Sequence, residues 1–316
     1  MTSFAFIFPG QGAQAVGMGR ELADAYPSAR AVFEEVDEAV GLALSRLIFE
    51  GPEADLMLTA NTQPALMAVS LAAMRALEAE FGVKAHEAKL LAGHSLGEYS
   101  ALAAAGALSV GDAARLLRRR GLAMQAAVPV GEGAMAALIG KVDVALAEEI
   151  AAEGARQGVV VVANDNNVGN VVISGLRSGV DAAIVAAKAR GVRAVPLAVS
   201  APFHSPLMAP AAREMEEALA TAALSSPCSP IVVNVTARPV SDPQEIRRLL
   251  VEQVTARVRW RESVEWMASP EGGISRFVEV GSGKQLTGMV KRNAPEAGAI
   301  ALNTPADLEA FARSRS

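Results

Sequence analysis

Cysteine is almost absent from this chain of 316 residues, in which Cys228 is the only one. One thiol cannot form a disulfide within the chain, nor a metal site built from several thiolates. A lone cysteine is more often a small buried hydrophobe than a reactive group. We therefore expect no disulfide framework and no bound metal, and we expect the protein to reside in the reducing cytoplasm.

Strong charge imbalance and long hydrophobic runs are also absent. The formal net charge is −5 and no block of five or more like charges occurs, so composition gives no general attraction to nucleic acid or to anionic lipid. No stretch approaches the roughly 18 uninterrupted apolar residues of a membrane-spanning helix. The amino terminus has neither the basic region nor the cleavage site of a secretory signal. We expect a globular protein with neither nucleic acid nor membrane as a partner.

Hydrophobic residues make up 51% of the chain, which is enough to bury one large core and a smaller one. Residues 4–8 form a short apolar strand pattern that leads into a glycine loop, and helical patterns follow. Residues 89–92 form a second such strand before an alanine-rich helix, and residues 276–280 form another near the carboxyl end. Strands that alternate with helices in this way favour an α/β fold with a mostly parallel sheet.

The pattern changes between residues 130 and 199. The expected elements there are a strand at 134–139, a helix from 142, strands at 159–163 and 170–174, a helix at 178–190 and a strand at 192–199. This βαββαβ order is typical of a ferredoxin-like unit. The first pattern then resumes, with a strand at 230–235 and a helix at 243–253. We predict a ferredoxin-like small domain of residues 130–199, inserted into a discontinuous domain of residues 1–129 and 200–316.

Ser95 stands at the centre of Gly93-His94-Ser95-Leu96-Gly97, between the strand at 89–92 and the alanine-rich helix. A serine hydroxyl is a weak nucleophile, so it needs an exposed position, a base and donors for the oxyanion that develops. Glycines two residues either side permit the tight turn that lifts the hydroxyl to the carboxyl end of an α/β-hydrolase-like sheet. A serine that caps an ordinary helix is the alternative. The flanking strand and helix favour the nucleophile.

Three histidines are available as the base for this serine. His94 adjoins Ser95, and neighbouring side chains at a strand end point to opposite faces, so we expect it to pack rather than to reach the hydroxyl. His86 lies in a polar stretch at the amino end of the second strand, where a solvated loop is the simplest interpretation. His204 lies in an apolar, proline-bracketed loop where the small domain rejoins the larger one. A lone histidine is usually structural, but elimination selects His204, because clefts between domains bind ligands.

Arg120 is the arginine that helical phase places on the apolar side of its helix, unlike Arg118 and Arg119 beside it. A buried guanidinium needs an acidic partner, and its planar fork matches a carboxylate in two parallel hydrogen bonds. That partner is either an Asp or Glu of the protein or a carboxylate carried by the substrate, and helical phase alone favours neither.

Four motifs, in the order and spacing of the family and spread over nearly the whole chain, resemble the malonyl-CoA:acyl carrier protein transacylase family. The motifs are Phe8-Pro9-Gly10-Gln11-Gly12-Ala13-Gln14, Asn61-Thr62-Gln63-Pro64-Ala65, Gly93-His94-Ser95-Leu96-Gly97-Glu98-Tyr99 and Phe203-His204-Ser205-Pro206-Leu207-Met208. Glu279-Val280-Gly281 and Lys284 also fit the family pattern. Val168 and Asn170 depart from it, in an asparagine-rich loop where proline and glutamine are usual.

The resemblance implies a two-step ping-pong reaction through a malonyl ester of Ser95. His204 would deprotonate the serine, and a backbone carbonyl near Gln253 would orient the imidazole in place of an aspartate. The backbone N–H groups of Gln11 and Leu96 would form the oxyanion hole. These roles agree with those that the residues themselves indicate for Ser95 and His204.

The resemblance also implies the substrates. Arg120 matches the arginine that binds the malonyl carboxylate, and Phe203 resembles the residue whose ring leaves little room for an α-methyl branch. The implied partners are malonyl-CoA, which enters as a substrate, and acyl carrier protein, in fatty acid biosynthesis. We expect a monomer that needs no cofactor.

Four rival interpretations are weaker. Residues 10–15 fit the start of a dinucleotide-binding fingerprint, but the acidic residues about 20 positions on lie in a helical pattern with no second strand. Residues 281–284 lack the earlier glycine of a phosphate-binding P-loop. A serine hydrolase would share the Ser95 motif but should carry an Asp or Glu partner for its histidine. A non-enzymatic interaction module would leave Ser95 unreactive.

Overall fold

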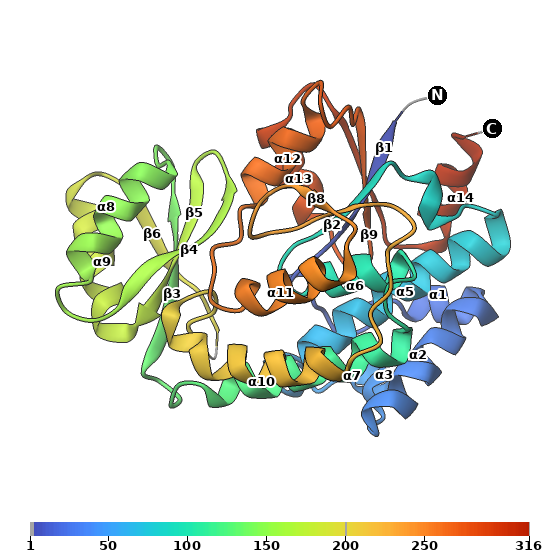
Figure 1. The fold of residues 1–316 in the computed structure, drawn as a ribbon, viewed down its shortest axis with the longest axis horizontal. Helices are drawn as coiled ribbons and strands as arrows, with labels where there is room; N and C mark the ends of the chain where they lie inside the picture. The colour runs from blue at the N-terminus through green and yellow to red at the C-terminus, as the bar shows by residue number, and fades with distance from the viewer. Residues whose placement is uncertain (1–2, 200, 316) are drawn as a thin grey trace.

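The computed structural model describes residues 3–199 and 201–315 and has two β-sheets in that part of the chain (Figure 1). The larger sheet has six strands in the order β10-β9-β1-β2-β7-β8. They are β1 (Phe4–Phe8), β2 (Leu90–Gly93), β7 (Ile231–Val232), β8 (Pro239–Val240), β9 (Arg276–Val280) and β10 (Gly298–Leu302). Neighbouring strands are parallel except for β8, which is antiparallel to β7. The expected α/β class with a mainly parallel sheet is confirmed.

β1 lies in the middle of this sheet, and its alternating side chains divide the surrounding core in two. Phe4, Phe6 and Phe8 pack on one face with the larger set of helices, whereas Ala5 and Ile7 pack on the other with α12 and α13. Because both faces are covered, the strand is apolar at every position.

The helices of this part surround the sheet on both faces (Figure 1). They are α1 (Arg20–Ala25), α2 (Pro27–Val40), α3 (Leu44–Glu50), α4 (Glu53–Leu56), α5 (Thr59–Phe81), α6 (Gly97–Ala104), α7 (Val110–Ala126), α10 (Ala209–Thr221), α11 (Pro243–Gln253), α12 (Trp260–Ala268), α13 (Gln285–Asn293) and α14 (Pro305–Arg313), with short 3-10 turns at Ala85–Glu87 and Pro206–Met208. None of the helices in residues 3–199 and 201–315 is both long and apolar enough to span a membrane.

The smaller sheet is antiparallel and lies at one end of the molecule, on the left of Figure 1. Its strands, in the order β4-β5-β3-β6, are β3 (Gly133–Ile139), β4 (Val160–Asn167), β5 (Asn170–Leu176) and β6 (Arg193–Pro196). Ala136 and Leu138 of β3 pack under α8 (Val144–Gly154) and α9 (Arg177–Ala189), in a core of their own. Met135 and Ala137 face the other way and join the large core. One face of the small sheet therefore carries its helices and the other faces the larger part.

Strand β4 of the small sheet is bonded to the part of the chain that surrounds the larger sheet. Val258, just before α12, donates its backbone N–H to the Ala163 carbonyl at 2.8 Å and accepts from the Asp165 N–H at 2.9 Å. Arg261 forms an ion pair at 2.8 Å with Asp165, whose side chain is buried. The strand expected at 159–163 is longer in the structure, because its polar continuation stays paired with β5 through Asn167 while Asp165 also finds partners in the larger part.

Two expected strands are shorter in the structure. β6 ends at Pro196 rather than at 199, because residues 197–199 leave the sheet and line a pocket. β7 covers Ile231–Val232 rather than 230–235, because the chain turns after Val233 into the antiparallel strand β8. Residue 200, where the second segment of the discontinuous domain was expected to begin, lies outside the described residues. β8 and β10 had not been expected.

Candidate active site

Ser95 lies on a sharp turn between β2 and α6. Its φ angle of 52° is in the left-handed region, which is strained for a residue with a side chain. A Cβ at Gly93 would come within 1.9 Å of the Gly97 backbone, and one at Gly97 within 2.4 Å of the Phe8 carbonyl oxygen. The two glycines of the motif are therefore required by the close packing of strand, turn and helix, as expected from the sequence.

Asn234 holds this turn from outside the motif. Its Oδ1 accepts the Ser95 backbone N–H at 2.7 Å, and its Nδ2 donates to the Gly93 carbonyl at 2.7 Å. Asn234 is fully buried, so both bonds are shielded from water. The side chain thus fixes the peptide groups on both sides of His94, and with them the direction of the Ser95 hydroxyl.

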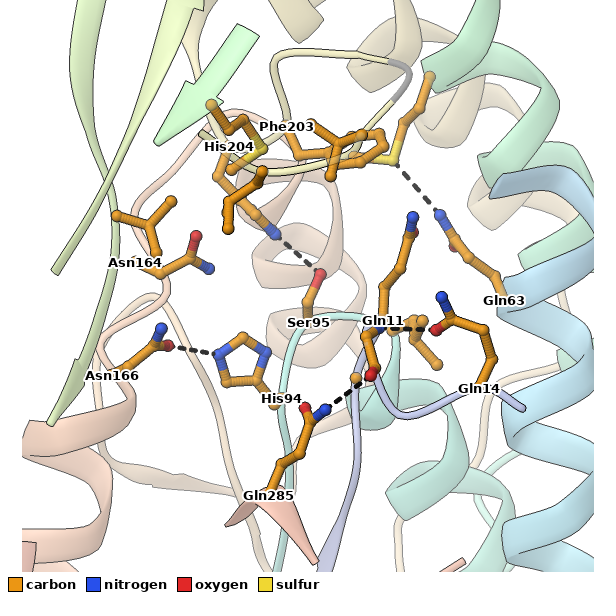
Figure 2. A pocket seen from close by; sticks show the side chains of 18 of the residues that line it. Gln11, Gln14, Gln63, His94, Ser95, Asn164, Asn166, Phe203, His204 and Gln285 are labelled. Carbon is orange, nitrogen blue, oxygen red and sulfur yellow. Dashed lines mark hydrogen bonds between the residues drawn. The ribbon is translucent and has the colours of Figure 1, made fainter. Parts of the chain in front are cut away.

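His204 contacts Ser95 directly, and Figure 2 shows the imidazole pointing at the hydroxyl. The distance from Nε2 to Ser95 Oγ is 2.8 Å, and Nδ1 lies 2.9 Å from the Gln253 backbone carbonyl. Since a carbonyl only accepts, the proton resides on Nδ1, and Nε2 is free to accept from the serine. The structure therefore brings together Ser95, His204 and the Gln253 carbonyl, and no carboxylate contacts the imidazole among the described residues.

The protonation state of His204 suits a base. Burial, reinforced by the charge of Arg120, lowers its pKa to about 3. Because this pKa lies below the ordinary value of 6.5, the imidazole is neutral at neutral pH and can accept a proton. The serine is thus paired with a base in the correct state.

The other two histidines lie where the sequence placed them. His94 bonds through Nε2 to Asn166 Oδ1 at 2.9 Å and packs edge-on against Trp260, with ring centroids 5.6 Å apart. Figure 2 shows that its ring lines the cavity below Ser95. His86 is exposed in the 3-10 turn before β2. Neither imidazole makes a hydrogen bond to the serine hydroxyl.

Arg120 is 1% exposed and reaches the same hydroxyl from α7. One terminal nitrogen donates to Gln63 Oε1 at 2.8 Å. The other donates to Gln253 Oε1 at 2.9 Å and to Ser95 Oγ at 3.2 Å. In the described part of the chain Arg120 makes no ion pair with an Asp or Glu, and its Nε has no partner. Helical phase alone allowed an Asp or Glu of the protein as the partner of Arg120. No such carboxylate contacts the guanidinium in the described residues.

A cavity of about 300 Å³ opens beside these groups, between the small sheet and the carboxyl ends of β1 and β2. Its lining includes Phe203, Gln11 and Leu96. No hydrogen bond from the backbone N–H of Gln11 or Leu96 is seen among residues 3–199 and 201–315. A serine with its base, a buried arginine and two residues whose backbone N–H groups have no hydrogen bond in this range thus line one cavity, an arrangement suited to an acyl group that carries a negative charge.

Several residues of this site were missed by sequence reasoning. Gln63 lies in one of the four motifs, but the sequence analysis gave it no role. Nothing in the sequence around Asn234 indicated that it belongs to the site. Glu98, a carboxylate in the alanine-rich helix three residues after Ser95, did offer a local signal. In the asparagine-rich loop, Asn166 lines the cavity, whereas Val168 is 64% exposed at the hairpin tip.

Comparison with known proteins agrees with this geometry. The acyl transferase domain model matches residues 5–304. The chain therefore belongs to the acyl transferase family.

Individual members of the family show a more specific similarity. The Malonyl CoA-acyl carrier protein transacylase of Escherichia coli K12 is 45% identical over 312 residues, covering 98% of this chain and 99% of that protein. The protein of the same name from Bacillus subtilis strain 168 is 43% identical over 311 residues, with 98% and 96% coverage. The resemblance that the four sequence motifs indicated is thereby confirmed.

Solved structures give the same result. The acyl-carrier-protein-S-malonyltransferase from Bartonella henselae is 51% identical with a TM-score of 0.96, and the match covers 99% of each chain. A malonyl-transacylase solved in complex with a type II PKS acyl-carrier protein is 41% identical with a TM-score of 0.94, covering 99% of this chain and 100% of that one.

Proposed function

We propose that the protein transfers a malonyl group from malonyl-CoA to the phosphopantetheine thiol of acyl carrier protein, in fatty acid biosynthesis. The observation that carries this proposal is the buried Arg120, which has no carboxylate partner in residues 3–199 and 201–315 and contacts the hydroxyl of a serine paired with histidine. A malonyl thioester supplies both an acyl carbon for Ser95 and a carboxylate for Arg120. The family and the names of the relatives support the same assignment.

In the first step the Ser95 oxygen attacks the thioester carbonyl while His204 Nε2 takes the hydroxyl proton. The backbone N–H groups of Gln11 and Leu96 stabilise the oxyanion, and loss of one such donor typically costs about 2.7 to 4 kcal/mol. The C–S bond then breaks, and His204 returns the proton to coenzyme A as it leaves. Ser95 now carries the malonyl group as an ester.

In the second step the carrier thiol gives its proton to His204 and attacks the ester carbonyl. The Ser95 oxygen leaves and recovers the proton, so the enzyme returns to its starting state. Phe203, buried beside the base, would narrow the space at the malonyl α-carbon. The reaction as proposed needs no metal and no cofactor, because coenzyme A enters as part of the substrate.

We also propose that the site lies between two domains. One is an α/β-hydrolase-like domain of residues 1–129 and 200–316, and the other is a ferredoxin-like domain of residues 130–199 inserted into it. The order β4-β5-β3-β6 and the separate core under α8 and α9 support the second. The proposed oligomeric state is a monomer, and the substrates and the lone cysteine fit a cytoplasmic location.

A product balance tests the proposed function against hydrolysis. With malonyl-CoA and carrier protein bearing its phosphopantetheine, we expect one malonyl-carrier to form for each coenzyme A released. Mass spectrometry of the carrier and a thiol assay measure the two amounts, with a carrier that lacks phosphopantetheine as control. Release of coenzyme A with an equal amount of free malonate would instead identify a hydrolase.

A further inference from the structure

Glu98 is a buried carboxylate close to the reacting groups, in the first turn of α6. It is 2% exposed and forms no ion pair in the described part of the chain. One carboxylate oxygen accepts the Asn234 backbone N–H at 2.8 Å, and the other accepts from Gln253 Nε2. A carboxylate is costly to bury, so these two bonds call for an explanation.

The bond to Gln253 determines which way that side-chain amide faces. An ionised carboxylate can only accept, so the amide must present its nitrogen to Glu98. The same nitrogen donates to the Ser95 carbonyl at 3.0 Å. The amide oxygen is thereby left facing Arg120, from which it accepts at 2.9 Å. Glu98 thus selects the amide orientation that the arginine requires.

Gln253 also contacts the base through its main chain, since its carbonyl accepts from His204 Nδ1 at 2.9 Å. The second partner of Glu98, Asn234, holds the Ser95 turn through its side chain at 2.7 Å. Two residues distant in the chain therefore connect one carboxylate to the arginine, the base and the nucleophile.

The charge of Glu98 matters as well. Burial raises its pKa to about 7, while the hydrogen bonds from Asn234 and Gln253 and the charge of Arg120 oppose that rise. Its charge in turn raises the pKa of Arg120, against the larger effect of burial, so the ionised carboxylate supports the charged guanidinium without contacting it. Arg120 lines the cavity beside Ser95, where a substrate carboxylate would meet it.

We propose that Glu98 is a positioning residue for malonyl transfer. Through its hydrogen bonds to Gln253 and Asn234 it holds the arginine, the base and the nucleophile turn in one arrangement. Its negative charge also compensates the positive charge of Arg120 before the substrate arrives. This role rests on the proposed function of the site.

The test is Glu98→Gln, assayed at roughly pH 8, where the wild-type carboxylate is ionised. The new amide can still accept from Asn234, but it presents an N–H₂ group to the N–H₂ of Gln253. Either that bond is lost or the Gln253 amide turns over and presents N–H₂ to Arg120. We expect the ratio of malonyl to acetyl transfer rates, measured with the two acyl-CoA substrates, to fall about tenfold.

Glu279→Gln is the matched control. Glu279 is another fully buried carboxylate, but it accepts from Leu286 and Thr287 at the start of α13. Thermal unfolding should show a loss of stability in both variants, whereas the rate ratio should change only in Glu98→Gln. An unchanged ratio in folded Glu98→Gln would overturn the role of Glu98.

A second variant covers the case in which Glu98→Gln does not fold. Gln253→Met removes the amide and leaves Glu98 in place, so it should lower the ratio by a similar factor; an unaltered ratio would overturn the proposal. Failure of the wild-type protein to transfer malonyl would overturn the proposed function itself. Normal wild-type transfer with unchanged variants would overturn only the role of Glu98.

Discussion

Replacement of Ser95 by alanine is expected to abolish both malonylation of the protein and transfer to the carrier. The substitution removes the only hydroxyl that contacts both His204 Nε2 and Arg120 in the described part of the chain. The loss should be on the order of a millionfold in rate, the scale seen when a serine hydrolase loses its nucleophile. Intact-mass spectrometry after brief exposure to malonyl-CoA measures the adduct.

Ser100→Ala is the matched control for this result. Ser100 lies on the same helix, is fully buried, and its hydroxyl has no hydrogen-bond partner among the described residues. Its removal should leave malonylation intact. A malonyl adduct that persists in Ser95→Ala would place the nucleophile elsewhere and contradict the proposed mechanism.

Arg120→Ala is expected to lower malonyl transfer about a hundredfold while acetyl transfer falls far less, since two hydrogen bonds to a charged group are worth about 3 kcal/mol. An acetyl group has no carboxylate for the guanidinium to bind. In the wild-type protein Arg120 donates to the side-chain amide oxygens of Gln63 and Gln253. These oxygens carry no formal charge, so they do not neutralise the guanidinium, and a substrate carboxylate can do so. Rates with the two acyl-CoA substrates measure the effect.

Arg119→Ala provides the control on the same helix. Arg119 is ion-paired at the surface with Glu214, and its side chain is 42% exposed. We expect both transfer rates to stay near the wild-type values, because surface ion pairs contribute little. Equal losses of malonyl and acetyl transfer in Arg120→Ala would mean that the arginine supports the fold rather than the substrate.

Local patterns predicted a large part of this structure. The helix predicted near 243–253 is confirmed as α11, and its start carries two local signals, the cap Asp242 and a proline at the first helical position. Arg120 was singled out by helical phase, which depends on sequence spacing alone. The Ser95 turn followed from two glycines whose steric need the structure confirms.

Other features depend on residues far apart in the chain. Asn234 bonds to Ser95 across 139 positions and Gln253 to Glu98 across 155, so neither partner has a local signature. The shortness of β6 follows from residues 197–199 turning toward the cavity, which only the packed molecule determines. Tertiary hydrogen bonds and packing therefore determine these features, which local sequence patterns do not encode.

The most direct test of the account follows one malonyl group through the protein. The wild-type protein is incubated with malonyl-CoA, freed of it, and then mixed with carrier protein that bears its phosphopantetheine. The account predicts that intact-mass spectrometry shows one malonyl group on the isolated protein, and that the group moves to the carrier in equal amount. An isolated protein without the adduct, or an adduct that appears as free malonate rather than on the carrier, would contradict it.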